Sequence, residues 1–502
     1  MRTSGILMPI FSLASKGGIG TFGKEAYRFV DFLEKAKQTW WQILPLNPTN
    51  YGDSPYQSFS SYAGNPYFID PELLIEDGLL TKKEFLSFDF GKEGSSIDYG
   101  KLYQSRNAML KLAFSRFKED GDYEEFCGKN AFWLKDYALF MAIKNANDDI
   151  SWENWDESLK LRDKKAIEKA EKEHTQNIKF YCFVQYVFSK QWQALKSYAN
   201  QKGIKIIGDI PIYVAYDSAD VWSQPWQFQL DKELKPKAVA GCPPDAFSEG
   251  GQLWGNPLYD WKLMKSEGFA WWKRRIKYVL SLYDCVRIDH FRGFESYYSI
   301  PYGDKTAANG KWVKGPDIAL FKALEEELGS DLPIIAEDLG FLTPAVLKML
   351  KKTGYPGMKV LQFAFDTENE SEYLPHNYQS NCVVYTGTHD NDTILGWTES
   401  NDEKEVAFAE KYLNTKRDSG FNWAMMKSAV MSVADTCILT MQDLISLGSE
   451  GRINTPSTVG GNWGWRIDPN CINDWLAKII AELTVLYGRA KPEQTKEKTD
   501  SV

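Results

Sequence analysis

Residues 286–292 of this 502-residue chain place charged side chains at a spacing that suits catalysis. Val286 and Ile288 alternate with Arg287 and Asp289, and residues two apart on a β-strand point to the same side. Arg287 and Asp289 are therefore expected to face one cavity together. An isolated buried carboxylate resists ionisation, but a neighbouring guanidinium keeps it charged. The pair has two interpretations: an anionic nucleophile at a strand end, or a structural Arg–Asp ion pair.

Three further carboxylates, Asp209, Glu337 and Asp390, also follow apolar segments. Parallel barrels keep their chemistry at the carboxyl ends of their strands. Four such side chains, Asp289 included, are therefore expected to converge on one pocket. Any single one of them has an alternative interpretation as a helix N-cap, where Asp is favoured. The series of four is much harder to explain in that way.

Carboxylates on either side of one bond are the machinery of glycoside cleavage. Asp289, beside Arg287, suits the carboxylate that stays ionised and attacks the anomeric carbon. Glu337 has no adjacent cation in the sequence and lies near other carboxylates, which raises its pKa and suits an acid that then acts as a base. Asp390 is expected to bind sugar hydroxyls and to favour a positively charged transition state. His389 and Arg287 supply donors to hydroxyls near the reacting carbon.

A metal site is the competing interpretation of the same carboxylates. Asp209, Asp289, Glu337 and Asp390 are of the type that binds Mg²⁺ or Mn²⁺ for phosphoryl or isomerase chemistry. However, Arg287 is expected to lie inside that site, and no phosphate-cradling glycine loop follows the later strands. We therefore expect neither a metal nor a cofactor.

The elements that position these residues are short apolar segments rich in β-branched residues, typical of a parallel sheet covered on both faces. Eight strands are predicted, at 4–13, 40–45, 204–210, 283–288, 332–336, 358–365, 382–385 and 437–441. Helical patterns separate several of them, at 24–37, 183–201, 268–283 and 343–352. This alternation predicts an α/β fold, a (β/α)8 TIM barrel. A doubly wound sheet is the alternative, but no GxGxxG motif follows a strand.

We expect one catalytic barrel domain over residues 1–502, with three insertions between strands. Residues 81–179 are charged and helical in pattern and predict an inserted helical subdomain. Residues 213–263 are rich in Gly, Pro and Trp and predict an active-site loop insertion, because long irregular segments in compact enzymes are usually functional. Residues 398–428 predict a smaller helical insertion. Nothing after the last predicted strand resembles a separate β-domain.

The composition excludes several classes of function. The net charge is −9 with acidic and basic residues interspersed, so no basic stripe argues for nucleic acid or an anionic membrane. The seven cysteines form no CxxC pair, which disfavours a zinc site or a disulfide scaffold. A reducing cytoplasm fits best. No charged leader with a long apolar core and no apolar segment of transmembrane length is present.

Several longer motifs resemble those of the amylomaltase family, the 4-α-glucanotransferases of glycoside hydrolase family 77. They lie at 51–60, 64–67, 208–214, 241–247 and 251–257, around Asp289, Glu337 and Asp390, and at 462–466. The resemblance runs from the first predicted strand to residue 466, nearly the whole chain. The lack of a C-terminal β-domain agrees with that family and not with typical α-amylases.

The resemblance implies a role for each matching residue. Asp289 matches the nucleophile that forms a β-linked glycosyl-enzyme, Glu337 the acid/base and Asp390 the transition-state stabiliser. The remaining matches are to substrate-binding positions: Arg287 and His389 in the donor sugar site, Asp209 after the third strand, Gln252 and Trp254 in the loop over the acceptor side, Ser54 and Tyr56 after the second strand, and, more weakly, Asn462.

The predicted function is that of a retaining transglycosylase. It would cleave an α-1,4-glucan and transfer the glycosyl part to the 4-OH of glucose or of another glucan. The expected partners are malto-oligosaccharides, glucose and glucans derived from starch or glycogen. Two alternatives remain open at this point: an α-amylase-type hydrolase and a non-catalytic glucan-binding barrel. A binding protein has no need of Asp289, Glu337 and Asp390 together. The sequence does not indicate an oligomeric state.

Overall fold

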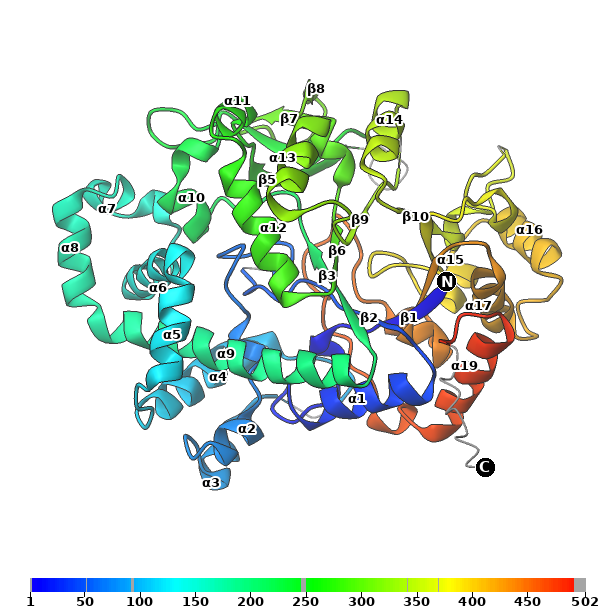
Figure 1. Ribbon diagram of the computed structural model, residues 1–502, viewed down its shortest axis with the longest axis horizontal. Helices are drawn as coiled ribbons and strands as arrows, with labels where there is room; N and C mark the ends of the chain where they lie inside the picture. The colour runs from blue at the N-terminus through cyan, green and yellow to red at the C-terminus, as the bar shows by residue number, and fades with distance from the viewer. Residues whose placement is uncertain are drawn as a thin grey trace, which may run out of the picture.

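Eight parallel strands form the centre of the computed structural model (Figure 1), which describes residues 2–50, 52–91, 94–244, 250–340, 342–368 and 370–491. In hydrogen-bonding order they are β10 (Gly357–Val360), β11 (Cys382–Tyr385), β12 (Thr436–Thr440), β1 (Thr3–Leu7), β2 (Trp40–Gln42), β3 (Lys205–Ile210), β6 (Cys285–Ile288) and β9 (Ile334–Ala336). The N–H of Ala336 donates to the carbonyl of Pro356 at 3.0 Å, which joins the two end strands. The predicted TIM barrel is confirmed.

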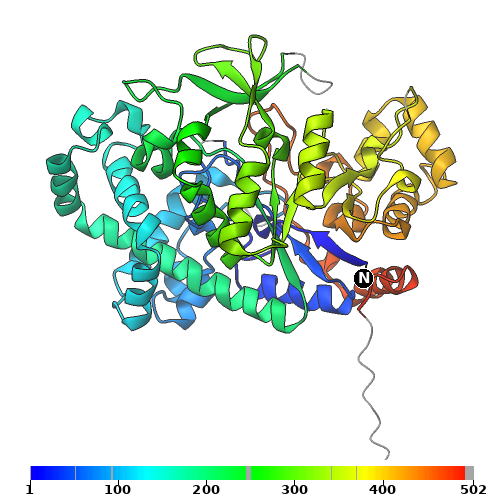
Figure 2. The ribbon, with the colours of Figure 1, turned by 45° about the horizontal axis from the view of Figure 1, so that its top comes forward.

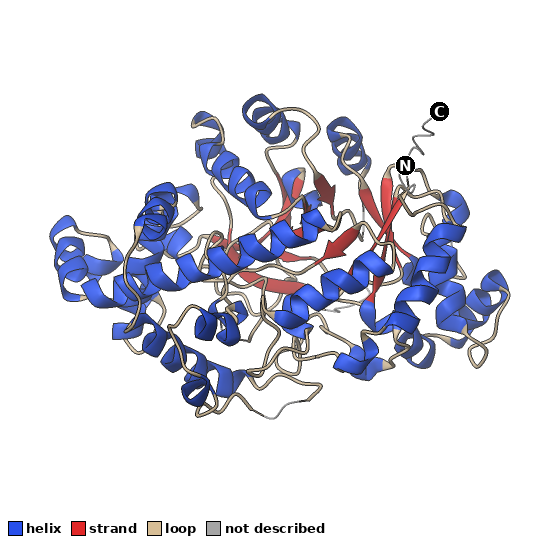
Figure 3. Cartoon of the chain, turned by 60° about the horizontal axis from the view of Figure 1, so that its bottom comes forward, coloured by secondary structure: helices blue, strands red, loops and turns tan. Residues whose placement is uncertain are grey.

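The strands are apolar on both faces because each is covered on both sides. Their burial is nearly complete, and some of their polar side chains bond to one another inside the barrel. One such contact crosses the interior, where the hydroxyl of Tyr385 donates to Oε1 of Gln42 at 2.9 Å. Figure 3 shows the strands at the centre with helices around them.

The helices that cover the barrel include all four that the sequence predicts. They are α1 (Lys24–Lys35), α9 (Thr175–Gln201), α12 (Ala270–Leu282), α13 (Ile318–Leu328), α14 (Pro344–Thr353), α18 (Met441–Leu444) and α19 (Asp474–Leu486). The start of α14 follows its sequence signal: Pro344 occupies the first turn and the Thr343 hydroxyl accepts the N–H of Val346. Helix α9 begins at Thr175, earlier than predicted, because it extends into the charged segment that precedes it.

A helical region lies beside the barrel, at the left of Figure 1. Between β2 and α9 it contains α2 (Pro71–Glu76), α3 (Lys82–Phe85), α4 (Tyr99–Phe114), α5 (Gly121–Lys129), α6 (Ala131–Ala146), α7 (Glu157–Lys160) and α8 (Lys164–Glu173). A second helical region contains α15 (Ile394–Ser400), α16 (Glu403–Leu413) and α17 (Phe421–Met431). Apart from α2, which precedes residue 81, the start of α15, which precedes residue 398, and the end of α17, which follows residue 428, these helices fall where the helical insertions 81–179 and 398–428 are predicted. The division of the chain into inserted units stays a prediction.

A second, antiparallel sheet lies above the barrel in the view of Figure 2. Its order is β5 (Gln252–Pro257), β4 (Ala238–Cys242), β7 (Ser296–Pro301) and β8 (Lys311–Lys314). The hydrophobic pattern does not predict these strands, and 213–263 is expected to be loop. That segment also carries α10 (Ala219–Ser223) and α11 (Trp261–Ser266). Residues 245–249, which include part of the motif at 241–247, lie outside the described residues.

The chain after β12 contains no further strand in its described part, which ends at residue 491. No helix among the described residues is long and apolar enough to cross a membrane.

Candidate active site

The carboxyl ends of β3, β6 and β9 bring together four charged side chains, Asp209, Arg287, Asp289 and Glu337, which we call the strand-end group. Asp209 pairs in register with Arg287. The main-chain N–H of Asp289 continues the ladder by donating to Ile210 at 2.9 Å, and that of Glu337 donates to Ile288 at 3.1 Å. Parallel register therefore places the carboxylates of three neighbouring strands at one rim.

Arg287 lies between two of these carboxylates. Its Nη1 donates to Oδ2 of Asp209 at 2.7 Å, and its Nη2 donates to Oδ1 of Asp289 at 2.8 Å. The side chains of Arg287 and Asp209 are 3% and 0% exposed, whereas that of Asp289 is 31% exposed. Burial raises the pKa of Asp209 to about 7 against the opposing effect of Arg287. Burial lowers the pKa of Arg287, but the two carboxylates outweigh it and the net pKa is raised.

Glu337 is held by main-chain donors rather than by a cation. Its Oε2 accepts the N–H of His290 at 2.7 Å, and its Oε1 accepts the N–H of Leu339 at 2.8 Å. Burial, and then the charge of Asp289, raise the pKa of Glu337 to about 7. The predicted direction of this shift is confirmed. A carboxyl group with this pKa exchanges its proton near neutral pH, as an acid/base must.

His290 adopts a left-handed backbone conformation, with φ 50° and ψ 47°, which aims its N–H at Glu337. The conformation is uncommon for a residue other than glycine. Burial, and then Arg292, lower the pKa of the His290 ring to about 3, so the ring is neutral at physiological pH. Its ring meets that of Trp254 edge-on at 4.8 Å.

A second set of residues, His389, Asp390, Arg452 and Asn454, lies on the connections after β11 and β12; we call it the loop group. Oδ1 of Asp390 accepts from Nδ2 of Asn454 at 2.6 Å, and its Oδ2 lies 3.3 Å from Nε2 of His389. His389 is buried, and this burial lowers its pKa. The side chain of Asp390 is 41% exposed, so one face of it remains open to a ligand.

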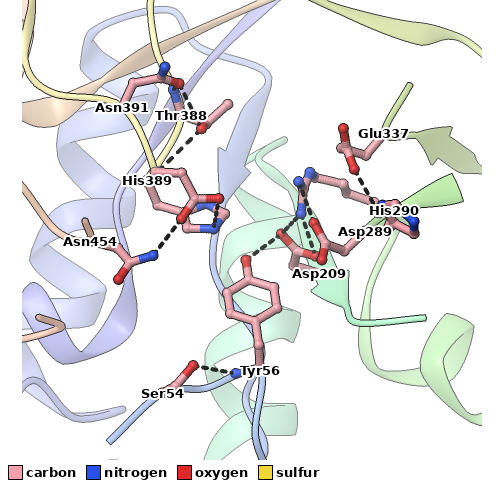
Figure 4. Close-up of polar contacts among 12 residues, drawn as sticks. Ser54, Tyr56, Asp209, Asp289, His290, Glu337, Thr388, His389, Asn391 and Asn454 are labelled. Carbon is pink, nitrogen blue, oxygen red and sulfur yellow. Dashed lines mark hydrogen bonds and ion pairs between the residues drawn. The ribbon is translucent and has the colours of Figure 1, made fainter. Parts of the chain in front are cut away.

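Tyr56 connects the two groups, as Figure 4 shows. Its hydroxyl donates to Oδ2 of Asp209 at 3.0 Å, and its ring stacks on that of His389 at 5.1 Å with 14° between the planes. Ser54 accepts the main-chain N–H of Tyr56 at 3.3 Å. This hydrogen bond links Ser54 to the main chain of Tyr56 rather than to a side chain of either group.

The other predicted binding residues fall in two places. Nε1 of Trp254 donates to Oε1 of Gln252 at 3.1 Å, and the contact of Trp254 with His290 brings this part of β5 beside the strand-end group. Asn462 instead bonds within its own loop, accepting from Thr455 at 3.0 Å and donating to the hydroxyl of Thr458 at 3.1 Å.

Comparison with known proteins places this chain in a family. A family model described as 4-alpha-glucanotransferase, of glycoside hydrolase family 77, matches residues 8–471. The chain belongs to the 4-alpha-glucanotransferase family. It is 52% identical over 490 residues to a 4-alpha-glucanotransferase of Clostridium butyricum, covering 96% of this chain and 100% of the relative. It is 47% identical over 481 residues to that of Thermus thermophilus, covering 93% and 95%.

A solved structure agrees with this family. The amylomaltase from Streptococcus agalactiae in complex with acarbose superposes with a TM-score of 0.95 at 42% identity, over 98% of this chain and 100% of that one. The resemblance found in the sequence motifs, and the barrel fold that it implies, are therefore confirmed.

Within this family fold, some residues of the site are invisible to motif reasoning. Arg452 and Asn454, which no motif singles out, contact Asp390. These residues come from a connection after β12 that has no helical or strand period. The barrel topology alone points to them, because the connection after the eighth strand also lies at the face of the barrel where the strands end.

A cavity of about 760 Å³ lies away from these carboxylates, between residues 48–50 and 52–53 and helices α4, α6 and α9. Tyr67, Tyr99 and Tyr103 are among its lining residues, whereas neither group contributes to it. We assign the chemistry to the carboxylates, because bond cleavage needs placed acid and base groups rather than volume. In the described part of the chain, no three or more His, Cys, Asp and Glu side chains are arranged to hold a metal ion.

Proposed function

We propose that this protein is a retaining 4-α-glucanotransferase that works through a covalent glycosyl-enzyme. The observation that carries the proposal is the contrast between Asp289 and Glu337. Asp289 is bonded to the buried guanidinium of Arg287, whereas Glu337 accepts from main-chain N–H groups and has its pKa raised to about 7. One carboxylate thus faces a cation while its neighbour can hold a proton, which is the division of labour that glycoside cleavage with retention requires.

In the first half of the proposed reaction, Glu337 donates its proton to the glycosidic oxygen. The carboxylate of Asp289 attacks the anomeric carbon, the bond from that carbon to the glycosidic oxygen breaks, and the shortened glucan leaves with a 4-OH. A β-linked ester between the sugar and Asp289 results. Two displacements at one carbon restore the α configuration, so the product linkage matches the substrate linkage.

In the second half, Glu337 takes the proton from the 4-OH of an acceptor sugar. The acceptor oxygen attacks the anomeric carbon, and the carboxylate of Asp289 leaves. Glu337 ends the cycle protonated, so no external acid or base is consumed. A group with a pKa near 7 suits both halves, because it gives and takes a proton at similar cost.

Asp390 is proposed to stabilise the positive charge that develops on the sugar ring in both halves. Its half-exposed carboxylate carries a negative charge to that region, and opposite charges interact more strongly in a water-poor site. His389 and Arg287 are proposed to contact hydroxyls of the donor sugar, together with Tyr56 and Asp209. Ser54 and Asn462 are proposed to shape the glucan path through the loops that they hold.

Transfer prevails over hydrolysis when water is excluded and a sugar hydroxyl is held in place. Trp254, with Gln252, is proposed to cover the acceptor side. The contact of Trp254 with His290 places the indole next to the residue that follows Asp289. An apolar ring there would disfavour a free water and offer a flat face to an acceptor sugar.

The proposed substrates are malto-oligosaccharides and related α-1,4-glucans, with glucose or a short glucan as acceptor. Cys127, Cys182, Cys242, Cys285, Cys382, Cys437 and Cys471 are free thiols. Free thiols fit a reducing compartment, and we propose the cytoplasm as the place of action.

The test is incubation of the protein with maltotriose alone, followed by chromatography of the products. Glucose together with oligomers longer than maltotriose is the expected result. Maltose and glucose without longer products would replace the proposal by a hydrolase. Unchanged maltotriose would leave a non-catalytic glucan-binding protein.

A further inference from the structure

The connection after β12 packs against the loop that carries Asp390, and two of its side chains make the contact. Nη2 of Arg452 donates to the main-chain carbonyl of Asp390 at 3.0 Å. Nδ2 of Asn454 donates to the Asp390 carboxylate at 2.6 Å. The main-chain N–H of Asn454 donates to the carbonyl of His389 at 3.1 Å. The main chain and the side chain of Asp390 are therefore fixed from the same segment.

This segment is itself cross-braced. Nε of Arg452 donates to the carbonyl of Asn454 at 2.8 Å, so the two contacting residues hold each other. Nη1 of Arg452 lies 3.7 Å from Oδ2 of Asp392, which also accepts from the hydroxyl of Ser449 at 2.7 Å. One guanidinium thus contacts two residues of the loop after β11 and one residue of its own segment.

Asp390 needs such a support because burial does not fix it. Its side chain is 41% exposed, and an exposed carboxylate on a loop is free to change rotamer. The amide of Asn454 is a neutral donor that does not titrate. Its hydrogen bond to Oδ1 therefore does not depend on a protonation change of the donor. The other oxygen, Oδ2, faces Nε2 of His389.

We infer that Asn454 is the positioning residue of Asp390, and that Arg452 supports it by holding the Asp390 main chain. This inference rests on the proposed function, in which Asp390 stabilises the transition state. Asn454 acts through Asp390, because its side-chain amide contacts that carboxylate. Its main-chain N–H donates to the carbonyl of His389, the residue before Asp390. A misplacement of about 1 Å in a catalytic group costs about 100-fold in rate.

The test is Asn454→Asp, which keeps the shape of the side chain but replaces the donor with an acceptor. The titratable and charged groups around Asp390 are His389, Tyr56, Arg452 and Asp392, and all of them are the same in wild type and variant. In this variant the carboxylate introduced at position 454 contacts that of Asp390. The two share a proton at low pH, because the charge of each raises the pKa of the other. A pair with one proton has the charge and the hydrogen bond of the wild-type pair.

We expect kcat for maltotriose to fall about 100-fold at neutral pH, with a much smaller change in KM. The ratio of variant to wild-type kcat should then rise as the pH is lowered from about 8 to about 5. Asn381→Asp is the matched control, because Asn381 precedes β11 at the opposite end of the barrel and donates to Gly354 at 3.0 Å. Its kcat ratio should stay near 1 throughout.

A second variant, Asn454→Ala, separates positioning from folding. It should lose activity to a similar extent, but its ratio of variant to wild-type kcat should not depend on pH. The thermal unfolding midpoints of both Asn454 variants should lie within a few degrees of that of Asn381→Asp. Equal ratios at all pH values for Asn454→Asp, or an activity within about threefold of wild type for Asn454→Ala, would overturn the inference. An inactive wild-type protein would instead refute the proposed function.

Discussion

The strand-end group and the loop group hold their carboxylates by different means. In the strand-end group, neighbouring strands fix the main chain, and a buried cation, Arg287, balances Asp209 and Asp289. In the loop group, Asp390 is held by an amide, by a buried histidine and by a guanidinium on its main-chain carbonyl. The first arrangement controls charge, and the second controls direction.

This difference agrees with what each group is proposed to do. Bond cleavage requires one carboxylate to be ionised and its neighbour to hold a proton, so the environment must set their protonation. Stabilising a developing positive charge requires only that a negative charge point at the right place. Tyr56 couples the two, because it bonds to Asp209 and stacks on His389.

The largest effect is expected from Asp289→Asn, which removes the nucleophile from the strand-end group. Turnover of maltotriose should fall by at least about 10³-fold, as is usual when a nucleophile is removed, because the amide cannot form the glycosyl-enzyme. Oligosaccharide binding, measured by calorimetry, should persist, since the loop group and Tyr56 are unchanged. Activity within about tenfold of wild type would show that another residue attacks.

Arg287→Met should be the next largest change, and it tests the claim that this group is governed by charge. Asp209 is fully buried, and loss of its cation should lower the free energy of unfolding by about 3–5 kcal/mol. Denaturant titration measures this change, and turnover should fall as well because Asp289 also loses its partner.

The double variant Arg287→Met with Asp209→Asn should recover part of the lost stability, because the unpaired buried charge is gone. Arg417→Met, which breaks an ion pair with Glu403 on the surface, is the control and should change stability little. A loss for Arg287→Met no greater than that of this control would contradict a charge-governed group.

The strand-end group is readable from the sequence because strand periodicity carries the information. The alternation of Val286 and Ile288 with Arg287 and Asp289 predicts both the strand and the side on which the charges lie. All eight barrel strands follow from short apolar segments rich in β-branched residues. The position of Glu337 beside Asp289 then follows from parallel register alone.

The contacts of the loop group are not readable in that way. Asp390 and His389 are recognisable by motif, but the residues that hold Asp390 come from an irregular connection whose path is set by tertiary packing. Asn462, carried over from family resemblance, bonds within its own loop. The sequence does not predict the second sheet for a related reason. Strand β4 pairs with β7, more than 50 residues further along the chain, and the short strand Ala238–Cys242 shows no alternation by itself.

A pH dependence of about tenfold per unit is expected from Glu337. The acid must be protonated in the first half of the reaction, so kcat/KM should decline as the pH rises through about 7. A rate that stays constant from about pH 6 to about pH 9 would contradict the assignment of the acid to a group with a raised pKa.

Stability should respond to the same group. The folded pKa of Glu337, about 7, lies above its ordinary value of 4.5, so the folded state binds the proton more tightly than the unfolded chain. The stabilisation is therefore complete below about pH 4.5 and is lost as the pH rises to about 7. Glu337→Gln cannot titrate, so the unfolding free energy of wild type minus that of this variant should fall as the pH rises across that window. A constant difference would contradict the shift.

The smallest expected effect is that of Trp254→Ala, which leaves the strand-end and loop groups in place. Cleavage should continue at a rate within about tenfold of wild type, because no group that moves a proton or forms a bond is removed. The fate of the glycosyl-enzyme should change, since water gains access beside His290 and the acceptor loses an apolar contact. The share of free reducing ends that arise without longer oligomers should therefore rise. Trp226→Ala is a suitable control, because Trp226 lies in the same segment as Trp254, residues 213–263, and is 55% exposed. Equal ratios of transfer to hydrolysis in both variants and in wild type would mean that water is excluded by some other part of the rim.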